Sequence, residues 1–167
     1  MRYSDIIFRK ALPSDIPSIR TLAEKSWWHH YPSIISEEQI RYMLQLIYSD
    51  EALQEQLGKG QDFYLFGKEE ANPQGYMSLS ILDENEAFLH KFYISSDAQG
   101  KGLGAAAFER LLRENPSVSC IRLTVNRQNF KSINFYFKLG FHIERVADFD
   151  IGNGYVMNDF VMKWTSN

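Results

Sequence analysis

The sequence has very little cysteine: Cys120 is the single one in a chain of 167 residues. An internal disulfide is therefore excluded, and the apolar residues around Cys120 indicate a small buried side chain rather than a reactive thiol. Long apolar runs are also missing, and none approaches the roughly 20 residues that cross a membrane. The first ten residues lack the apolar core and cleavage site of a secretory signal, so we expect a cytoplasmic protein with no membrane partner.

An excess of positive charge is missing as well. Lys and Arg number 18 against 21 Asp and Glu, which gives a formal net charge of −3. This balance argues against a nucleic-acid partner, because such proteins neutralise phosphates with clustered cations. It is compatible with a cationic partner such as an amine, although charge alone does not select one. The 44% of hydrophobic and 23% of charged residues are typical of a globular chain, and we expect residues 1–167 to form a single domain.

Apolar periodicity predicts a mixed α/β chain. Ser36-Glu37-Glu38-Gln39 is typical of a capping box at the start of a helix. One β-α-β crossover after a meander of strands, followed by a closing hairpin, favours a mixed sheet with helices on its faces. The strands are expected at 6–9, 63–66, 75–82, 87–94, 120–125, 141–149 and 155–164, and the helices at 15–26, 36–47, 50–57, 102–113 and 131–138.

The most informative segment is the glycine-rich run Gln99-Gly100-Lys101-Gly102-Leu103-Gly104, between a predicted strand and a predicted helix. Glycine tolerates positive φ and lets a ligand approach the backbone closely. The free N–H groups of the helix's first turn, together with the helix dipole, form a site suited to a pyrophosphate, and Lys101 adds a positive charge. The alternative is a tight turn that binds nothing.

Two other phosphate-binding motifs fit less well. Gly100-x-Gly102-x-x-Ala105 has the spacing of a dinucleotide fingerprint, but the polar spacer 95–99 separates it from the strand. The next strand ends at Val125-Asn126, with no acidic residue to hold a ribose. A P-loop is excluded because no Gly-Lys-Ser/Thr follows at the required distance.

Two motifs together resemble one family. Gln99-x-x-Gly102-x-Gly104 is similar to the acetyl-CoA-binding signature of the GNAT N-acetyltransferases, and the C-terminal segment 152–162 resembles the closing hairpin of bacterial polyamine-type members. Downstream, the segment 126–141, with Asn129, Ser132, Tyr136 and Gly140-Phe141, resembles the family's second conserved element. The first predicted strand and helix also resemble the family, so the resemblance covers nearly the whole chain. It implies the GNAT fold: a mixed, mostly antiparallel central sheet with helices on both faces and a splayed pair of parallel strands.

The resemblance implies acetyl-CoA as co-substrate, with its pyrophosphate on the glycine turn and its pantetheine arm between the splayed strands. It implies no metal. The adjacent histidines His29-His30 have no carboxylate cluster beside them that would complete a metal site. The residues expected to contact coenzyme A are Phe92, Tyr93, Ile94, Gln99, Gly100, Lys101, Gly102, Leu103, Gly104, Asn126, Asn129, Ser132 and Tyr136.

The resemblance also implies catalytic roles. Tyr136 matches the family tyrosine that protonates the departing thiolate, which a phenol within hydrogen-bond reach can do. His90, on the strand before the glycine turn, is the candidate general base, because histidine titrates near neutrality. Glu86, at the start of that strand, is the alternative base, and a water chain is a third. For each of these side chains a purely structural position is the competing interpretation.

The acceptor is expected to be a primary amine of a small molecule or peptide, attacked directly in a ternary complex. The cluster Trp27-Trp28-His29-His30-Tyr31 lies after the first predicted helix, where Trp27, His30 and Tyr31 are candidate substrate-binding residues or, alternatively, a packed anchor. A catalytically inactive CoA-binding sensor is the alternative function. A homodimer is compatible with the family, although no segment marks an interface.

Overall fold

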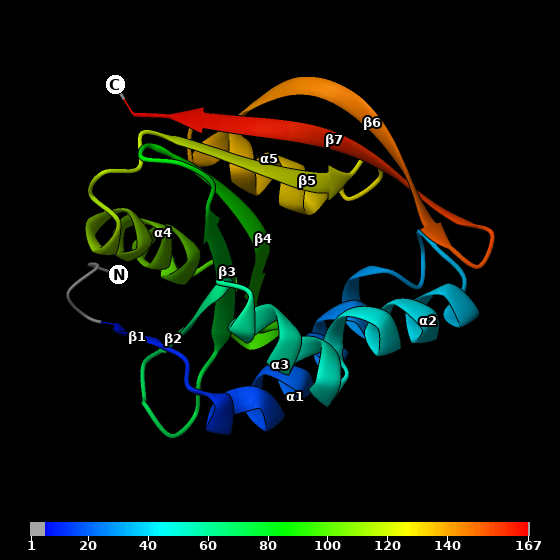
Figure 1. The fold of residues 1–167 in the computed structure, drawn as a ribbon, viewed down its shortest axis with the longest axis horizontal. Helices are drawn as coiled ribbons and strands as arrows, with labels where there is room; N and C mark the ends of the chain where they lie inside the picture. The colour runs from blue at the N-terminus through cyan, green and yellow to red at the C-terminus, as the bar shows by residue number, and fades with distance from the viewer. Residues whose placement is uncertain (1–5, 167) are drawn as a thin grey trace.

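The structure is a computed structural model, and it describes residues 6–166. Within these residues, seven strands form one sheet in the order β1-β2-β3-β4-β5-β7-β6 (Figure 1). All neighbouring strands are antiparallel except β4 and β5, which are parallel. The strands are β1 (Ile7–Lys10), β2 (Asp62–Gly67), β3 (Gly75–Ile81), β4 (Glu86–Ile94), β5 (Cys120–Asn126), β6 (His142–Gly152) and β7 (Tyr155–Thr165).

Helices cover both faces of the sheet (Figure 1). They are α1 (Ile16–His30), α2 (Glu37–Tyr48), α3 (Asp50–Gly58), α4 (Leu103–Glu114) and α5 (Phe130–Lys138). One apolar core lies under α4 and α5 and includes Phe108, Ile133 and Leu123. A second lies under α1, α2 and α3 and includes Ile19 and Tyr76. The predicted fold class, a mostly antiparallel mixed sheet with helices on both faces and one parallel strand pair, is confirmed.

Side chains at the helix starts explain several boundaries. Ser36 Oγ accepts a hydrogen bond from the Gln39 amide at 3.2 Å, so the predicted N-cap of α2 is confirmed. The reciprocal half of the capping box is wrong, because the Gln39 side chain points to Met157 on β7 instead. Ser49 caps α3 in the same way, and Asn129 Oδ1 caps α5 through the Ser132 amide.

Helix α1 is longer than predicted. It continues to His30 rather than ending near Ser26, so most of the aromatic cluster lies in its last turns. No glycine or proline lies between Ser26 and Tyr31 to end the helix earlier. The helix ends just before Pro32, because proline cannot continue it. The other predicted boundaries agree with the structure to within about three residues, an ordinary margin for helix and strand ends.

Strand β4 carries a β-bulge that changes which way its residues face. Leu79 pairs with Leu89 and Ser78 pairs with Lys91, so His90 is an extra residue on β4. Before the bulge, Leu89 packs in the core under α4 and α5. After it, Phe92 packs against that core, whereas Tyr93 packs in the core under α1. In the described part of the chain, no helix is long and apolar enough to cross a membrane.

Candidate active site

The parallel strands β4 and β5 separate after three paired positions. The last pair is Phe88 with Arg122, although β4 continues to Ile94 and β5 to Asn126. Each strand keeps its outer partner beyond that point, since Ile94 still pairs with β3 and Asn126 still pairs with β7. The strands therefore diverge toward their carboxyl ends (Figure 1). This divergence leaves backbone groups on the facing edges of two central strands available to an extended ligand.

The glycine turn follows β4 and begins α4 at the divergence. Gly100 and Gly102 have φ of 74° and 81°, the left-handed region that favours glycine. Nothing lies within 4 Å of the position where a Cβ of Gly100 would stand, so this part of the turn faces open space. The Gln99 side chain holds the turn to β4 by donating to the Ile94 carbonyl at 2.8 Å.

The start of α4 has the features of an anion site. Gly102 is the N-cap and provides no capping side chain. The first intrahelical bond of α4 runs from the Ala106 amide to the Gly102 carbonyl, so the amides before Ala106 have no partner within the helix. Lys101 adds a positive charge and donates from Nζ to the Asp97 carbonyl at 2.7 Å. Free amides, a helix dipole and a cation fit the pyrophosphate of a nucleotide-like ligand.

Gly104 has a different role from the two glycines before it. A Cβ at this position would lie 2.5 Å from Ile94 Cδ1 and 2.7 Å from Phe135 Cζ. The missing side chain therefore lets the start of α4 pack directly against the end of β4 and against α5. Close packing, rather than an unusual φ, accounts for this glycine.

Tyr136 lies on α5, behind the diverging strands. Its ring is buried, with its centroid 6.4 Å from that of Phe92 and 5.6 Å from that of Phe141. Burial raises the pKa of the Tyr136 phenol well above its usual value, so the hydroxyl carries its proton at neutral pH. A protonated phenol can donate to a developing anion, which is the chemistry of a general acid.

The candidate bases on β4 lie elsewhere. Glu86 is at the closed end of the strand pair, where its carboxylate forms an ion pair with Arg122 at 3.1 Å. His90 Nε2 is 2.8 Å from Ser80 Oγ, and burial together with Lys91 lowers the pKa of the imidazole to about 4. His90 is neutral at pH 7, but so low a pKa makes it a weak proton acceptor.

The last turn of α1 lies across the open end of the divergence. The His30 ring is 6.1 Å from that of Tyr93 on β4, while Tyr31 is hydrogen-bonded to Asn129 at the start of α5. The ring of Trp27 is buried and stacks on that of Tyr31, with the two centroids 4.3 Å apart, so Trp27 packs Tyr31 against the core. The structure therefore brings the predicted acceptor residues and the predicted CoA residues to one place.

Asparagine side chains shape the connection between β5 and α5. Asn126 Oδ1 accepts from the Gln128 amide at 2.9 Å, and Asn129 Oδ1 accepts from the Ser132 amide at 3.2 Å. Both oxygens are thus used within the loop. The predicted contacts of Asn126, Asn129 and Ser132 with coenzyme A stay predictions.

Sequence reasoning missed one residue at this place, Asp159 on β7. It pairs directly with Asn126 at the end of β5, and it is a buried carboxylate with an exposed fraction of only 7%. A signal was present in the sequence: Met157, Asp159 and Val161 alternate along a strand, so one face carries both apolar side chains and the acid.

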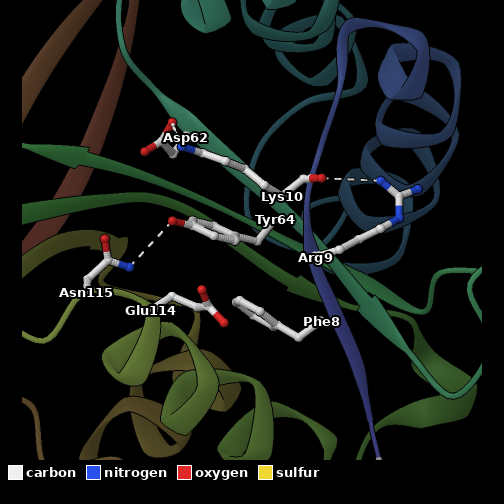
Figure 2. Close-up of a pocket in the computed structure, with 7 residues that line it drawn as sticks. All are labelled: Phe8, Arg9, Lys10, Asp62, Tyr64, Glu114 and Asn115. Carbon is white, nitrogen blue, oxygen red and sulfur yellow. Dashed lines mark hydrogen bonds and ion pairs between the residues drawn. The ribbon is translucent and has the colours of Figure 1, made fainter.

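Two other kinds of site find little support in the structure. Figure 2 shows a hollow at the opposite end of α4 from the glycine turn, lined by β1, β2 and Asn115. Its charged residues are all ion-paired: Lys10 with Asp62 at 2.8 Å inside the hollow, and Arg9 and Glu114 with Asp15 and Arg110 outside it. Among residues 6–166, no three His, Cys, Asp or Glu side chains gather as they would around a metal ion.

Comparison with known proteins agrees with this geometry. The sequence model of the acetyltransferase (GNAT) family matches residues 23–141. A spermidine N(1)-acetyltransferase of Thermoplasma acidophilum is 29% identical over 146 residues, which are 83% of this chain and 89% of that protein.

Solved structures share the fold. The PaiA N-acetyltransferase of Thermoplasma acidophilum, in complex with coenzyme A, has a TM-score of 0.79 and 26% identity, covering 96% of this chain and 99% of that one. A spermidine N-acetyltransferase of Vibrio cholerae, in complex with CoA and spermine, has a TM-score of 0.68 and 20% identity, covering 97% and 96%. The glycine turn, the diverging strands and the family match lead to one conclusion: the chain belongs to the acetyltransferase (GNAT) family and is an acetyl-CoA-dependent N-acetyltransferase.

Proposed function

We propose that the chain transfers the acetyl group of acetyl-CoA to a primary amine of a small molecule, by direct attack in a ternary complex. The observation that carries the proposal is the meeting of the glycine turn, the diverging strands β4 and β5, and the last turn of α1. The first two would hold acetyl-CoA, and the third would border the acceptor. No group on the chain is needed to carry the acetyl group in between.

Each residue of the turn has a distinct task in this proposal. Gly100 and Gly102 expose amides to the pyrophosphate, and Lys101 adds a charge beside them. The free edge of β4 around Phe92–Ile94 pairs with the pantetheine arm as an added strand would. When bound, acetyl-CoA supplies the acetyl group as an activated thioester.

Tyr136 supplies the proton that the leaving thiol requires. The amine's lone pair forms the new C–N bond, the C–S bond breaks, and the phenol protonates the departing sulfur. The high pKa of Tyr136 keeps that proton in place until sulfur becomes anionic. The amine must also lose a proton, and that step needs an acceptor on the other side of the reacting centre.

A polyamine is the acceptor class that we propose to test first. The chain's net charge of −3 favours a cationic substrate, and the relative from Thermoplasma acidophilum is a spermidine N(1)-acetyltransferase. The end of α1 places Tyr31 on the acceptor side, with the buried ring of Trp27 stacked against it. Aromatic faces attract ammonium groups through cation–π contacts.

The first experiment is a calorimetric titration of the protein with acetyl-CoA. Wild-type protein is expected to bind, and Gly100→Glu is expected to lose binding because it places a carboxylate among the amides. Gly60→Glu is the matched control, since Gly60 also has positive φ (87°) and nothing within 4 Å of its Cβ position. Equal binding by wild type and Gly100→Glu would contradict the placement of the pyrophosphate.

A second experiment separates an enzyme from a sensor. The wild type is incubated with acetyl-CoA and spermidine, spermine, putrescine, lysine or an alanyl peptide, and the free thiol and acetylated products are measured. Turnover of at least one amine is expected. Binding of acetyl-CoA without turnover of any primary amine would instead indicate a CoA-binding sensor.

A further inference from the structure

Asp159 has an oxygen that lacks a partner. Its side chain is 7% exposed, and its Oδ1 atom is buried with no hydrogen-bond partner among the described residues. Leaving a buried acceptor unsatisfied costs free energy, on the order of 1–3 kcal/mol and more for a charged group. Folds keep such groups where they serve a ligand or a reaction, so the position of this atom needs an explanation.

The carboxylate lies where the active site opens. Asp159 is paired with Asn126 on one side and with Ala147 on the other. Residues paired directly across an antiparallel ladder share a face, so all three side chains point the same way. Asn126 ends β5, beyond the last pairing of β5 with β4 at Arg122.

Asp159 faces the acceptor side of the sheet. Met157, two residues earlier on β7, packs in the core under α1, α2 and α3, and strand alternation points Asp159 to that same face. Tyr31, at the end of α1, lies near it: burial raises the pKa of Tyr31, and the charges of Asp159 and of the Tyr136 phenol raise it to a smaller extent. The carboxylate, Tyr31 and the proposed acid Tyr136 therefore belong to one neighbourhood.

The charged groups around Asp159 leave it without a permanent counter-ion. Arg127, which follows β5, is ion-paired to Asp148 on β6 at 2.6 Å. Burial raises the pKa of Asp159, a hydrogen bond from Thr124 and the charge of Arg127 lower it, and Asp148 raises it, so that the pKa is about 6. The carboxylate is therefore mostly ionised at pH 7 and is a stronger proton acceptor than an exposed aspartate.

We propose that Asp159 accepts a hydrogen bond from the acceptor amine and takes its proton as the new C–N bond forms. The inference rests on the proposed function and assigns the proton acceptor that it requires. The acceptor first releases its ammonium proton to water and enters the step as a neutral amine. The nitrogen lone pair then bonds to the acetyl carbon, the C–S bond breaks, the remaining N–H proton passes to Oδ1, and Tyr136 protonates sulfur. Asp159 then returns a proton through water to Tyr136, so one proton moves in total from nitrogen to sulfur.

This assignment differs from the bases expected on β4. Glu86 is held by Arg122 at the closed end of the strand pair, and His90 is engaged with Ser80. Asp159 has an oxygen without a partner and stands at the open end. Among these three candidate bases, the one with an unsatisfied oxygen is therefore on β7 rather than on β4.

The test compares Asp159→Asn with Asp150→Asn, the loss of an exposed carboxylate on the neighbouring strand β6. We expect both variants to bind acetyl-CoA as the wild type does in calorimetry. With the best amine from the screen, Asp159→Asn should lose roughly 100-fold or more in kcat/KM, the usual contribution of a general base, and Asp150→Asn far less. The wild-type kcat/KM should fall below about pH 6 as Asp159 is protonated, and the residual activity of Asp159→Asn should lack this limb.

A direct titration keeps the inference falsifiable on its own. The Asp159 carboxyl carbon is followed by NMR against pH, with and without spermidine, in protein saturated with CoA. An ammonium partner favours the charged carboxylate, so spermidine should lower its pKa. An unchanged pKa, or a kcat/KM in Asp159→Asn equal to that of wild type, would overturn the inference. If the wild type binds no acetyl-CoA, the proposed function fails, and the same titration with spermidine alone still decides whether Asp159 binds amines.

Discussion

At the scale of single residues, the raised pKa of Asp159 affects both the proposed proton transfer and the stability of the fold. Its carboxyl has an ordinary pKa of 3.8 in the unfolded chain and about 6 in the folded one, chiefly because it is buried. A raised acid pKa means that the folded state holds the proton more tightly than the unfolded state between these values. The ionised carboxylate therefore destabilises the fold above about pH 6, and this penalty disappears as the pH falls toward 4.

Asp159→Asn is accordingly expected to stabilise the protein at pH 7. The gain in the free energy of unfolding should be on the order of 1–3 kcal/mol, because one pKa unit corresponds to about 1.4 kcal/mol. The difference from wild type should shrink toward zero near pH 4. Urea unfolding at several pH values measures it, with Asp150→Asn as the exposed control, for which a change within about 1 kcal/mol is expected. A less stable Asp159→Asn at pH 7 would indicate a structural role instead.

At the scale of secondary-structure elements, Gly104 joins α4 to its surroundings. Replacing it with alanine adds a Cβ at 2.5 Å from Ile94 Cδ1 and 2.7 Å from Phe135 Cζ. Overpacking of this kind typically costs about 1–3 kcal/mol, which outweighs the roughly 1 kcal/mol that alanine gains over glycine in a helix. We expect Gly104→Ala to lower the free energy of unfolding and to shift the start of α4.

Gly58→Ala is the control for this prediction. Gly58 is the last residue of α3, and nothing lies within 4 Å of its Cβ position, so alanine there should be neutral or stabilising. Thermal unfolding of the two variants beside wild type provides the comparison. An equally stable Gly104→Ala would mean that Ile94 and Phe135 move aside without cost, and that this glycine is not needed for packing.

Elements with strong local signals could be predicted from the sequence. The N-cap at Ser36 and the positive φ angles of the glycine turn could both be predicted, because each depends only on residues that are close together in the sequence. The bulge at His90 could not be predicted, because one inserted residue changes neither composition nor period enough to be seen. The burial of Asp159 depends on α1 and β7 meeting, which is a tertiary fact that local patterns do not contain.

At the scale of the whole molecule, the site lies between two halves, which are the apolar cores on the two faces of one sheet. β4 and α4 belong mainly to the core that contains Phe108, while α1 belongs to the core that contains Tyr76. The opening of β4 from β5 lies where these two halves meet, so a ligand there touches both. This arrangement separates the proposed co-substrate side, built by α4 and α5, from the proposed acceptor side, built by α1 and β7.

Hydrogen exchange measured with and without acetyl-CoA tests this organisation. Saturating ligand should slow exchange of the amides at 100–105 and along the end of β4, because these groups are expected to receive the pyrophosphate and the pantetheine arm. The amides around the hollow of Figure 2, at 8–10 and 62–64, should exchange as before, since its charges are already paired. The same experiment on Gly100→Glu should show no protection at either place. Slowed exchange at the hollow in wild-type protein would move the ligand to the far end of α4 and contradict the site described above.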